Sequence, residues 1–383
     1  FAMISKTLFF DNLDELKSES AALKAFSPSL LIAFASASFF EQEQLYITLK
    51  DVCPNVIGCS TAGEISGTRV LESCISICAI RFESKAHVKM YETHLTDMQH
   101  SNDAGAALLN QINKNGLKGI YLLAPGIDIN GSALIEGLTE NLPKGVSISG
   151  GLAGDNGSFE QTFVMHNNGV STRSVVAVAF YGDQLSFEYG AHGGWRSFGP
   201  ARRVSSAKAN ELFELDNKPA LDIYKNYLGE YAKDLPASGL LFPFEVLSEA
   251  GTPTGIIRTI LGIDEEAKSL ILAGEVNENQ YLRLMHASTD DLISGALEAL
   301  SPLSTTINSG DSQSLALVTS CVGRKLVMGD RVEEEIEEVG RRLSKNTRIA
   351  GFYSYGEVSP SSNTSHCELH NQTLTIMLLR EKP

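Results

Sequence analysis

The chain has 383 residues, of which 43% are hydrophobic and 20% are charged, and these proportions are typical of a folded globular protein rather than a disordered or fibrous one. At roughly 100–200 residues per domain, this length predicts two or three domains. The net charge of −15 disfavours nucleic acid and anionic membrane surfaces as partners, and no apolar run approaches the ~20 residues that a membrane-spanning helix needs.

The cysteines and the first residues indicate the cellular compartment. Six cysteines are scattered without a CxxC pair, so neither a zinc ribbon nor a disulfide scaffold is indicated. We expect them to be small buried side chains in a reducing compartment. The first residues lack the charged and apolar segments of a secretory signal. The sequence therefore predicts a cytoplasmic protein without membrane insertion.

The first half of the chain predicts the same order of elements twice. Short apolar runs near Gly, Ser and Pro indicate buried strands, and the mixed polar segment after the first strand indicates a helix. The first copy has a strand, a helix, a strand with a turn, and a last strand at 29–36, 41–53, 55–66 and 74–82. A weaker copy follows at 119–126, 133–142, 145–155 and 174–183.

The pattern changes after the second copy, and we predict a domain boundary near 185–195. The segment that follows contains a short amphipathic helix, two strands of a hairpin, a longer helix and a loop. These elements are predicted at 220–228, 254–264, 268–276, 289–300 and 303–312, with Thr289 as the cap of the longer helix.

A third copy ends the predicted pattern, with elements at 314–320, 331–344, 348–359 and 372–379. Its helix places Val332, Ile336, Val339 and Leu343 at helical spacing. We therefore expect an α/β protein with two packed domains, built from repeated strand–helix–strand units with mixed sheets. The predicted division is an N-terminal extension at 1–24, a first domain at 25–187 and a second domain at 188–383.

Each copy places a glycine and an acid just after an apolar strand. The three pairs are Gly63-Glu64, Gly154-Asp155 and Gly356-Glu357. The backbone alone explains such a turn, because glycine accepts a positive φ and the acid caps nearby amides. Alternatively, the turns form a polar pocket at the strand ends, where α/β sheets bind ligands. The nearby hydroxyl groups would contact a polar molecule or satisfy one another; they belong to Ser60, Thr61, Tyr353, Ser354 and Tyr355.

Several motifs, in the right order, resemble a known family. NVIGCSTAGEI at 55–65 and SGGLAGD at 149–155 resemble the N-terminal FIST sensory domain. The stretch from Gly194-Trp195 to LFELDNKPALDIYKNYLG resembles the start of the FIST C-terminal domain. SCVGRKLVMG, GFYSYGEVSP and HNQTLTIMLL resemble the closing motifs of that domain. The resemblance covers roughly residues 25–383.

The resemblance implies a bacterial, non-enzymatic sensor of a small ligand, either an amino acid or a similar polar metabolite. Because no output module fits in this length, the signal would pass to a separate partner, such as a histidine kinase. Some members of the family resemble haem proteins that sense nitric oxide, so a haem-based sensor is the alternative function. The oligomeric state and the identity of the ligand stay open.

An amino-acid ligand needs a carboxylate for its ammonium group and a cation for its carboxylate. Glu357 and Arg324 follow neighbouring strands, so we expect them at the same sheet end as ammonium acceptor and carboxylate donor. An ion pair between the two, or a solvated Arg324, is the alternative. The complete set of candidate ligand-binding residues is Ser60, Thr61, Gly63, Glu64, Gly154, Asp155, Arg324, Tyr353, Ser354, Tyr355, Gly356 and Glu357.

Metal binding and catalysis are less well supported by the sequence. His366 and His370 in HCELH lead into a strand, where they would lie ~13 Å apart, so no firm metal site is predicted. His192 and His370 are the candidate ligands of a non-covalent haem, and a structural histidine is the alternative for each. No P-loop, GxSxG or HExxH motif occurs, and Cys59 is a candidate nucleophile without a neighbouring histidine in sequence.

Overall fold

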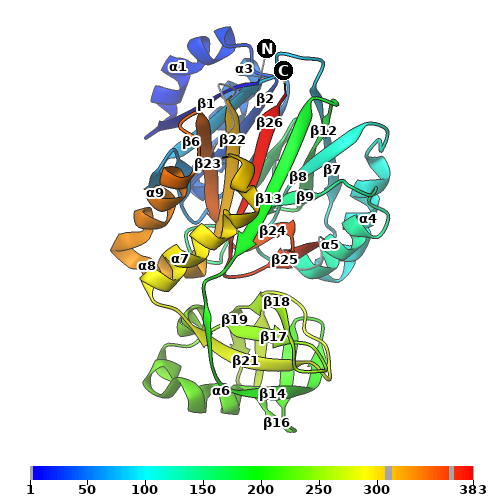
Figure 1. Cartoon of the computed structure of the whole chain (residues 1–383), viewed down its shortest axis with the longest axis vertical. Helices are drawn as coiled ribbons and strands as arrows, with labels where there is room; N and C mark the ends of the chain where they lie inside the picture. The colour runs from blue at the N-terminus through cyan, green and yellow to red at the C-terminus, as the bar shows by residue number, and fades with distance from the viewer. Residues whose placement is uncertain (1–2, 307–312, 362–365, 383) are drawn as a thin grey trace.

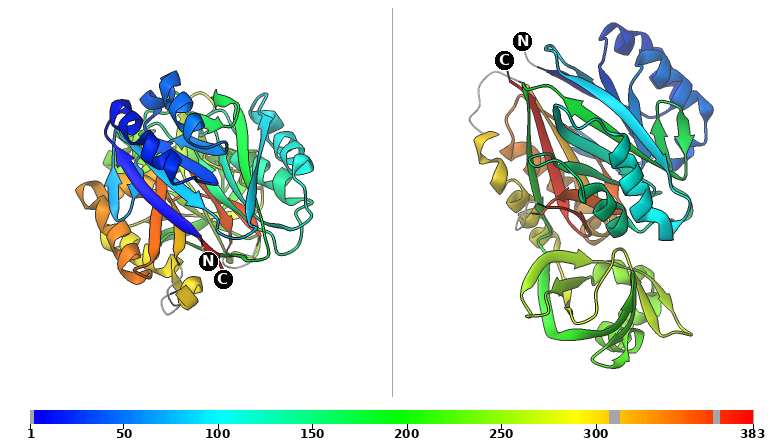
Figure 2. Two further views of the ribbon diagram at one scale, coloured as in Figure 1. Left: turned by 90° about the horizontal axis from the view of Figure 1, so that it is seen from above. Right: turned by 90° about the vertical axis from the view of Figure 1, so that its right-hand side faces the viewer.

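The computed structural model describes residues 3–306, 313–361 and 366–382. It consists of an α/β body and a β-rich insert at 196–286, which lies below the body in Figure 1 and in the right panel of Figure 2. The predicted α/β class with repeated units and mixed sheets is confirmed. Part of the predicted loop at 303–312 lies outside the described residues.

Three equivalent four-stranded units make up the body. In each unit the two strands joined by a helix are parallel, and the outer strands are antiparallel to their neighbours. The first unit has the order β1 (Ile4–Phe10), β6 (Ile75–Arg81), β2 (Leu30–Ala35), β3 (Val56–Ser60). The second has β7 (His87–His94), β12 (Ser174–Tyr181), β8 (Leu117–Ala124), β9 (Ile148–Leu152). The third has β13 (Leu185–His192), β26 (Leu374–Glu381), β22 (Ser314–Cys321), β23 (Thr347–Ser354).

A glycine at the same register position marks the equivalence of the three units. A Cβ atom on any of the three would come within 2.4 Å of the facing carbonyl oxygen, so only glycine allows this approach of the parallel strands. The facing pairs are Gly58 with Ala33, Gly150 with Leu122, and Gly351 with Val318.

Each sheet is completed by a hairpin from another unit. The hairpin of the first unit extends the third sheet, that of the second extends the first sheet, and that of the third extends the second. The units therefore form a closed cycle of exchanged hairpins. These hairpins are β4 (Glu64–Ser66) with β5 (Arg69–Leu71), β10 (Val164–His166) with β11 (Gly169–Ser171), and β24 (Gly356–Pro360) with β25 (Cys367–His370).

Helices cover the outer faces of the three sheets, and the apolar core lies between them. Side chains from all three units meet in that core, where Phe34 stacks on Phe352 with ring centroids 4.9 Å apart. The helices are α1 (Leu13–Ala25), α2 (Ala37–Phe40), α3 (Glu43–Val52), α4 (Ser101–Gln111), α5 (Gly131–Thr139), α7 (Thr289–Ala299), α8 (Val322–Met328) and α9 (Val332–Arg342). Among the described residues, no helix combines the length and the apolar character needed to cross a membrane.

The predicted cap of α7 is wrong by one residue. Thr289 is the first helical residue, and Ser288 is the N-cap, because its side chain accepts a hydrogen bond from Asp291 N–H. The Asp291 carboxylate in turn accepts from the Ser288 backbone, which completes a capping box.

The insert has its own apolar core between its strands and α6 (Ala220–Leu228). The predicted hairpin is present as β19 (Ile260–Asp264) with β20 (Ser269–Leu272), but the predicted first strand is broken at Thr259. Its other half pairs elsewhere in the insert. The remaining strands are β14 (Arg196–Lys208), β15 (Glu211–Leu215), β16 (Lys218–Pro219), β17 (Phe244–Leu247), β18 (Pro253–Arg258) and β21 (Tyr281–His286).

The predicted division between residues 187 and 188 falls inside β13. Strands from both predicted domains share the sheets of the body, because β4 and β5 extend the third sheet and β24 and β25 extend the second. In space the chain separates instead into the body and the insert (Figure 1). The division stays a prediction about units of sequence.

Candidate functional site

The structure brings the turns after β3, β9 and β23 together at one end of the body. Three equivalent backbone hydrogen bonds of 2.8–3.1 Å link them in a cycle. They run from Ala62 N to Tyr353 O, from Gly154 N to Ser60 O, and from Tyr355 N to Leu152 O. The cycle of turns therefore follows the cycle of exchanged hairpins.

This cycle shows that the turn of the second copy must be shifted by one residue to align with the other two. Gly154 occupies the place of Ala62 and Tyr355, so Asp155 stands where the other copies have glycine. The Asp155 carboxylate instead holds the following loop, because it accepts hydrogen bonds from the amides of 159–161 and from the Tyr355 hydroxyl. The Gly154-Asp155 pair therefore has a different structural role from the two Gly-Glu pairs.

The two Gly-Glu turns share one geometry. Thr61 Oγ1 donates to Glu64 at 2.6 Å, and Ser354 Oγ donates to Glu357 at 2.7 Å, in each case across three residues. Both glutamates are at most 1% exposed. Their carboxyl groups are therefore held from within the turn.

The second carboxylate oxygen of each glutamate faces the residue that precedes the last strand of its unit. For Glu64 this residue is Cys74, whose thiol lies at 3.4 Å. For Glu357 it is Thr373, which donates from its amide at 3.1 Å and from its hydroxyl at 2.9 Å. Loss of hydration on burial raises the pKa of both carboxyls to about 7, although their hydrogen-bond donors partly oppose it.

The ion pair between Arg324 and Glu357, which the sequence analysis gave as an alternative to ligand binding, is not formed. The guanidinium is fully buried and pairs with Glu335, with Nε at 2.8 Å from the carboxylate. Its remaining N–H groups donate to backbone carbonyls, among them that of Leu292 at 2.9 Å. The other oxygen of Glu335 accepts from Ser320 and Tyr353. Arg324 therefore has no donor left for a ligand carboxylate in this structure.

The twelve predicted ligand-binding residues are placed together, but they form an interior. Ser60 Oγ, for example, accepts from Phe163 N–H at 2.8 Å, and the Tyr355 hydroxyl accepts from Gly157 N–H at 2.8 Å. None of the twelve lines the two cavities beside the turns, within the described residues. Their polar groups bond within the chain, some to one another, as Thr61 does to Glu64 and Ser354 to Glu357, and others to neighbouring residues.

Lys325 is the residue that the sequence analysis missed. Its Nζ donates to Ala62 O at 2.8 Å and to Asn156 Oδ1 at 3.2 Å, and it makes an ion pair with Glu72. It thus joins turns of the first two units to α8 of the third. A Cβ on Gly63 would lie 3.3 Å from Nζ, so glycine at this position keeps room for the ammonium group.

Two adjoining cavities open beside Lys325. A polar cavity of about 580 Å³ is lined by Lys325 and by the acids Glu72, Asp330 and Glu333. An apolar cavity of about 910 Å³ lies between the body and the insert. Both cavities are in the size range of small-molecule sites, and Asn156 and Leu326 line both of them.

The two candidate haem ligands lie on a third cavity. His192 and His370 line a space of about 240 Å³ between β13 and the insert. Burial lowers the pKa of both imidazoles, that of His370 to about 4, so they are neutral at pH 7. His370 Nε2 donates to Ser359 O at 3.1 Å. The residues present do not fit a haem, since the space is below the ~300–1,000 Å³ of sites for drug-sized ligands.

Other candidates for chemistry are also buried. Burial raises the pKa of the Cys59 thiol well above its usual range, so this side chain is a poor nucleophile. Cys367 in HCELH lies in β25, where its sulfur accepts from Ile148 N–H at 3.1 Å. Among the described residues, no group of three or more His, Cys, Asp or Glu side chains is placed to hold a metal ion.

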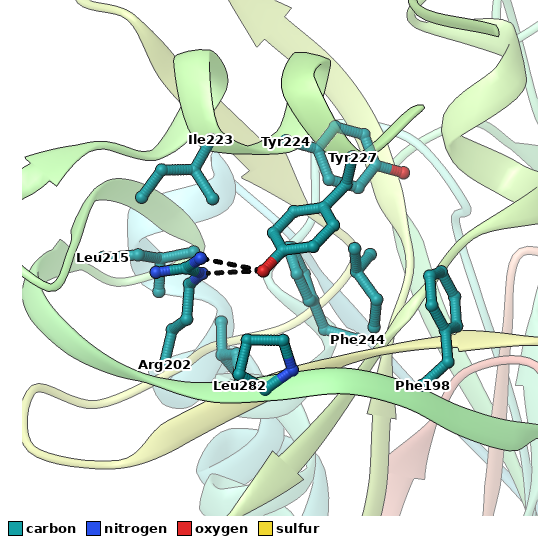
Figure 3. Close-up of a pocket in the computed structure, with 10 residues that line it drawn as sticks. Phe198, Arg202, Leu215, Ile223, Tyr224, Tyr227, Phe244 and Leu282 are labelled. Carbon is teal, nitrogen blue, oxygen red and sulfur yellow. Dashed lines mark hydrogen bonds between the residues drawn. The ribbon is translucent and has the colours of Figure 1, made fainter. Parts of the chain in front are cut away.

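A fourth cavity, in the insert, is small. Figure 3 shows Arg202 and Tyr227 pointing toward each other across it, with guanidinium donors 2.8 and 3.2 Å from the tyrosine oxygen. Its volume is about 10 Å³, which is room for no more than one water molecule. This cavity is therefore part of the packed interior of the insert.

Comparison with protein families gives two consecutive matches. The model of the FIST N domain matches residues 29–218, and that of the FIST C domain matches residues 220–360. The junction of the two matches falls inside the insert, just before α6.

Comparison with individual proteins gives a distant relative. The uncharacterized protein MJ1623 of Methanocaldococcus jannaschii is 23% identical in an alignment of 361 residues that covers 82% of this chain. The chain spans 66% of the length of that relative.

Among solved structures, a cyanuric acid hydrolase from A. caulinodans matches over 98% of both chains with 8% identity and a TM-score of 0.39. PurL of T. maritima in complex with ATP matches 99% of this chain and 71% of its own, with 8% identity and a TM-score of 0.20. At these scores neither likeness bears on the fold or the activity.

Proposed function

Since the chain belongs to the FIST family, whose domains are sensory domains of signal-transduction proteins, we propose that it is a cytoplasmic sensor of a small polar metabolite of the amino-acid type. The signal then passes to a separate partner protein, such as a histidine kinase. In this proposal the chain binds its ligand without chemical conversion, and the candidate nucleophile Cys59 is buried with a raised pKa.

The charge pattern of the polar cavity carries this proposal. One lysine and three carboxylates line the cavity, so a molecule with both a positive and a negative group complements it. The ammonium group of Lys325 binds the ligand carboxylate. Glu72, which is 55% exposed, and Glu333 bind the ligand ammonium.

In this proposal the residues that the sequence analysis assigned to the ligand lie behind the cavity and support it. The linked turns place Ala62 O and Asn156 Oδ1, which orient the Lys325 ammonium group. Glu64 and Glu357 keep two of the turns in shape through Thr61 and Ser354. These residues support the site without touching the ligand.

Isothermal titration with the twenty L-amino acids, each added to the full chain, tests the proposal. We expect at least one to bind, and we expect Lys325→Met to weaken that binding at least tenfold, because a charge-assisted contact is lost. The matched control is Lys24→Met, since Lys24 pairs with Asp51 on a remote surface at 3.0 Å.

Besides the absence of binding by every amino acid, two results would overturn the proposal. One is an affinity that Lys325→Met leaves unchanged. The other is a bound haem, seen as a surplus mass in the native mass spectrum and as a Soret band that disappears in His192→Ala or His370→Ala. The second result would support the gas sensor that the family resemblance offers as the alternative.

A further inference from the structure

The apolar cavity has walls from the body and from the insert. Leu326 comes from α8 of the body, and Tyr231 comes from η2 (Gly229–Asp234) of the insert. Phe159 comes from the loop that Asp155 holds. A molecule in this cavity therefore contacts both parts of the protein at once.

Three of the large apolar side chains that line the cavity are exposed. Phe159, Tyr231 and Leu326 are 37%, 52% and 50% exposed, and they are three of the six large hydrophobic side chains that the described residues expose. Single exposed apolar residues need no explanation, but a convergence of three of them around a cavity is typical of a ligand site.

One of these three side chains, Phe159, is held in place by its neighbours. The Phe159 ring stacks on Tyr355 with centroids 4.3 Å apart, and the Tyr355 hydroxyl is bonded to Asp155 and to Gly157 N–H. The apolar surface is thus built on the linked turns and does not depend on a mobile side chain. Such a preformed wall loses little conformational entropy when a ligand binds.

The apolar cavity continues into the polar one. Asn156 and Leu326 line both, and Asn156 accepts the hydrogen bond from Lys325 at 3.2 Å. A ligand with its charged end at Lys325 therefore reaches the apolar cavity with a group attached next to that end.

We infer that the ligand is an amino acid with a large apolar side chain, aromatic or branched aliphatic, which occupies part of the cavity between body and insert. This inference rests on the proposed function, because it adds a side-chain pocket to the site at Lys325. Burial of the side chain against Phe159, Tyr231 and Leu326 selects the ligand, while the charged cavity recognises the backbone groups common to amino acids. Binding joins the insert to the body.

Titration of the full chain with L-phenylalanine, L-leucine and L-alanine tests this inference. We expect phenylalanine or leucine to bind at least tenfold more tightly than alanine, because the apolar side chain leaves water. Tyr231→Ala, on the insert side, should remove most of this preference and leave the affinity for alanine unchanged, because Tyr231 lines only the apolar cavity. Leu326→Ala, on the body side, should also reduce the preference, so the test does not depend on one variant that fails to fold.

The control is Ile47→Ala, because Ile47 is 48% exposed on α3, away from the cavity, and is as exposed as Leu326. If alanine binds as tightly as phenylalanine and leucine, the inference is wrong and the proposed function stands. If the preference is present but neither Leu326→Ala nor Tyr231→Ala reduces it, the pocket is elsewhere and the inference is also wrong. If no amino acid binds, both fall.

Discussion

The buried interior around Arg324 and Glu335 lies next to the rim of the polar cavity, which is formed by Lys325 and Glu72. The two regions hold their charges in opposite ways. Behind the turns, Arg324 and Glu335 are fully buried and every donor is used within the chain. On the rim, Lys325 is 12% exposed and pairs with the half-exposed Glu72. A buried, fully bonded pair stabilises one geometry, whereas a partly exposed pair can exchange its partner for a ligand. Burial therefore separates the pair that fixes the fold from the pair that stays accessible at the cavity.

The largest effect that tests this comparison is expected from Glu335→Ala. The variant leaves the buried Arg324 without its counter-ion, which costs about 3–5 kcal/mol of the free energy of unfolding. Urea denaturation measures this loss. Glu337→Ala is the control on the same helix, since Glu337 is 45% exposed and lies 3.7 Å from Arg341, and about 0.5 kcal/mol or less is expected. Equal losses in the two variants would contradict the comparison.

A smaller effect is expected from the pH dependence of the two Gly-Glu turns. Burial raises the pKa of Glu64 and Glu357 from 4.5 to about 7, so the folded chain binds more protons than the unfolded one between these values. Their contribution to the free energy of unfolding therefore falls as the pH rises from 4.5 to 7, by up to about 1.4 kcal/mol per pH unit for each carboxyl. Above pH 7 this contribution is constant.

The measurement is urea denaturation between pH 5 and pH 8. The double variant Glu64→Gln/Glu357→Gln should show a shallower decline of stability between pH 5 and pH 7 than the unaltered chain. Glu249→Gln is the control, because Glu249 is exposed in the insert. A slope that the double variant does not change would show that these carboxyls are ionised throughout.

The smallest effect on stability is expected from Glu72→Gln on the rim. Because Glu72 is 55% exposed, the loss of its pair with Lys325 should change the free energy of unfolding by about 0–1 kcal/mol. Affinity for phenethylamine should nevertheless fall about tenfold, since a charged contact to the ammonium group is lost. Titration with phenethylamine and 3-phenylpropionate checks this, and an equal change for both would place the ammonium group elsewhere.

The repeated fold could be predicted because each unit repeats its own local pattern. Apolar strands near 29–36, 119–126 and 314–320 are each followed by a helix and a strand with a central glycine. The exchange of hairpins could not be predicted in this way. Strands of three residues, such as β4 and β10, carry too short a pattern to specify which sheet they extend.

The sequence analysis selected Arg324, which is buried, whereas its neighbour Lys325 is the residue that lines a cavity. Arg324 and Lys325 are neighbours on α8, and successive residues of a helix point in directions about 100° apart. A seven-residue helix shows too little periodicity to tell which one faces the interior. Glu335 was hidden in the acidic run of α9, because such a run normally marks a solvated face.

The closed cycle of hairpins also constrains the order in which the body is completed during synthesis. The first sheet can pair with β10 and β11 once residue 171 has been made, but β9 cannot pair with β24 until β24 and β25 have been made. For about half of translation, β9 (Ile148–Leu152) therefore has β8 on one side but lacks β24 on the other. An open edge on a ribosome-bound chain is a surface for chaperones and for aggregation, so slow translation of the insert should lower the yield of folded protein.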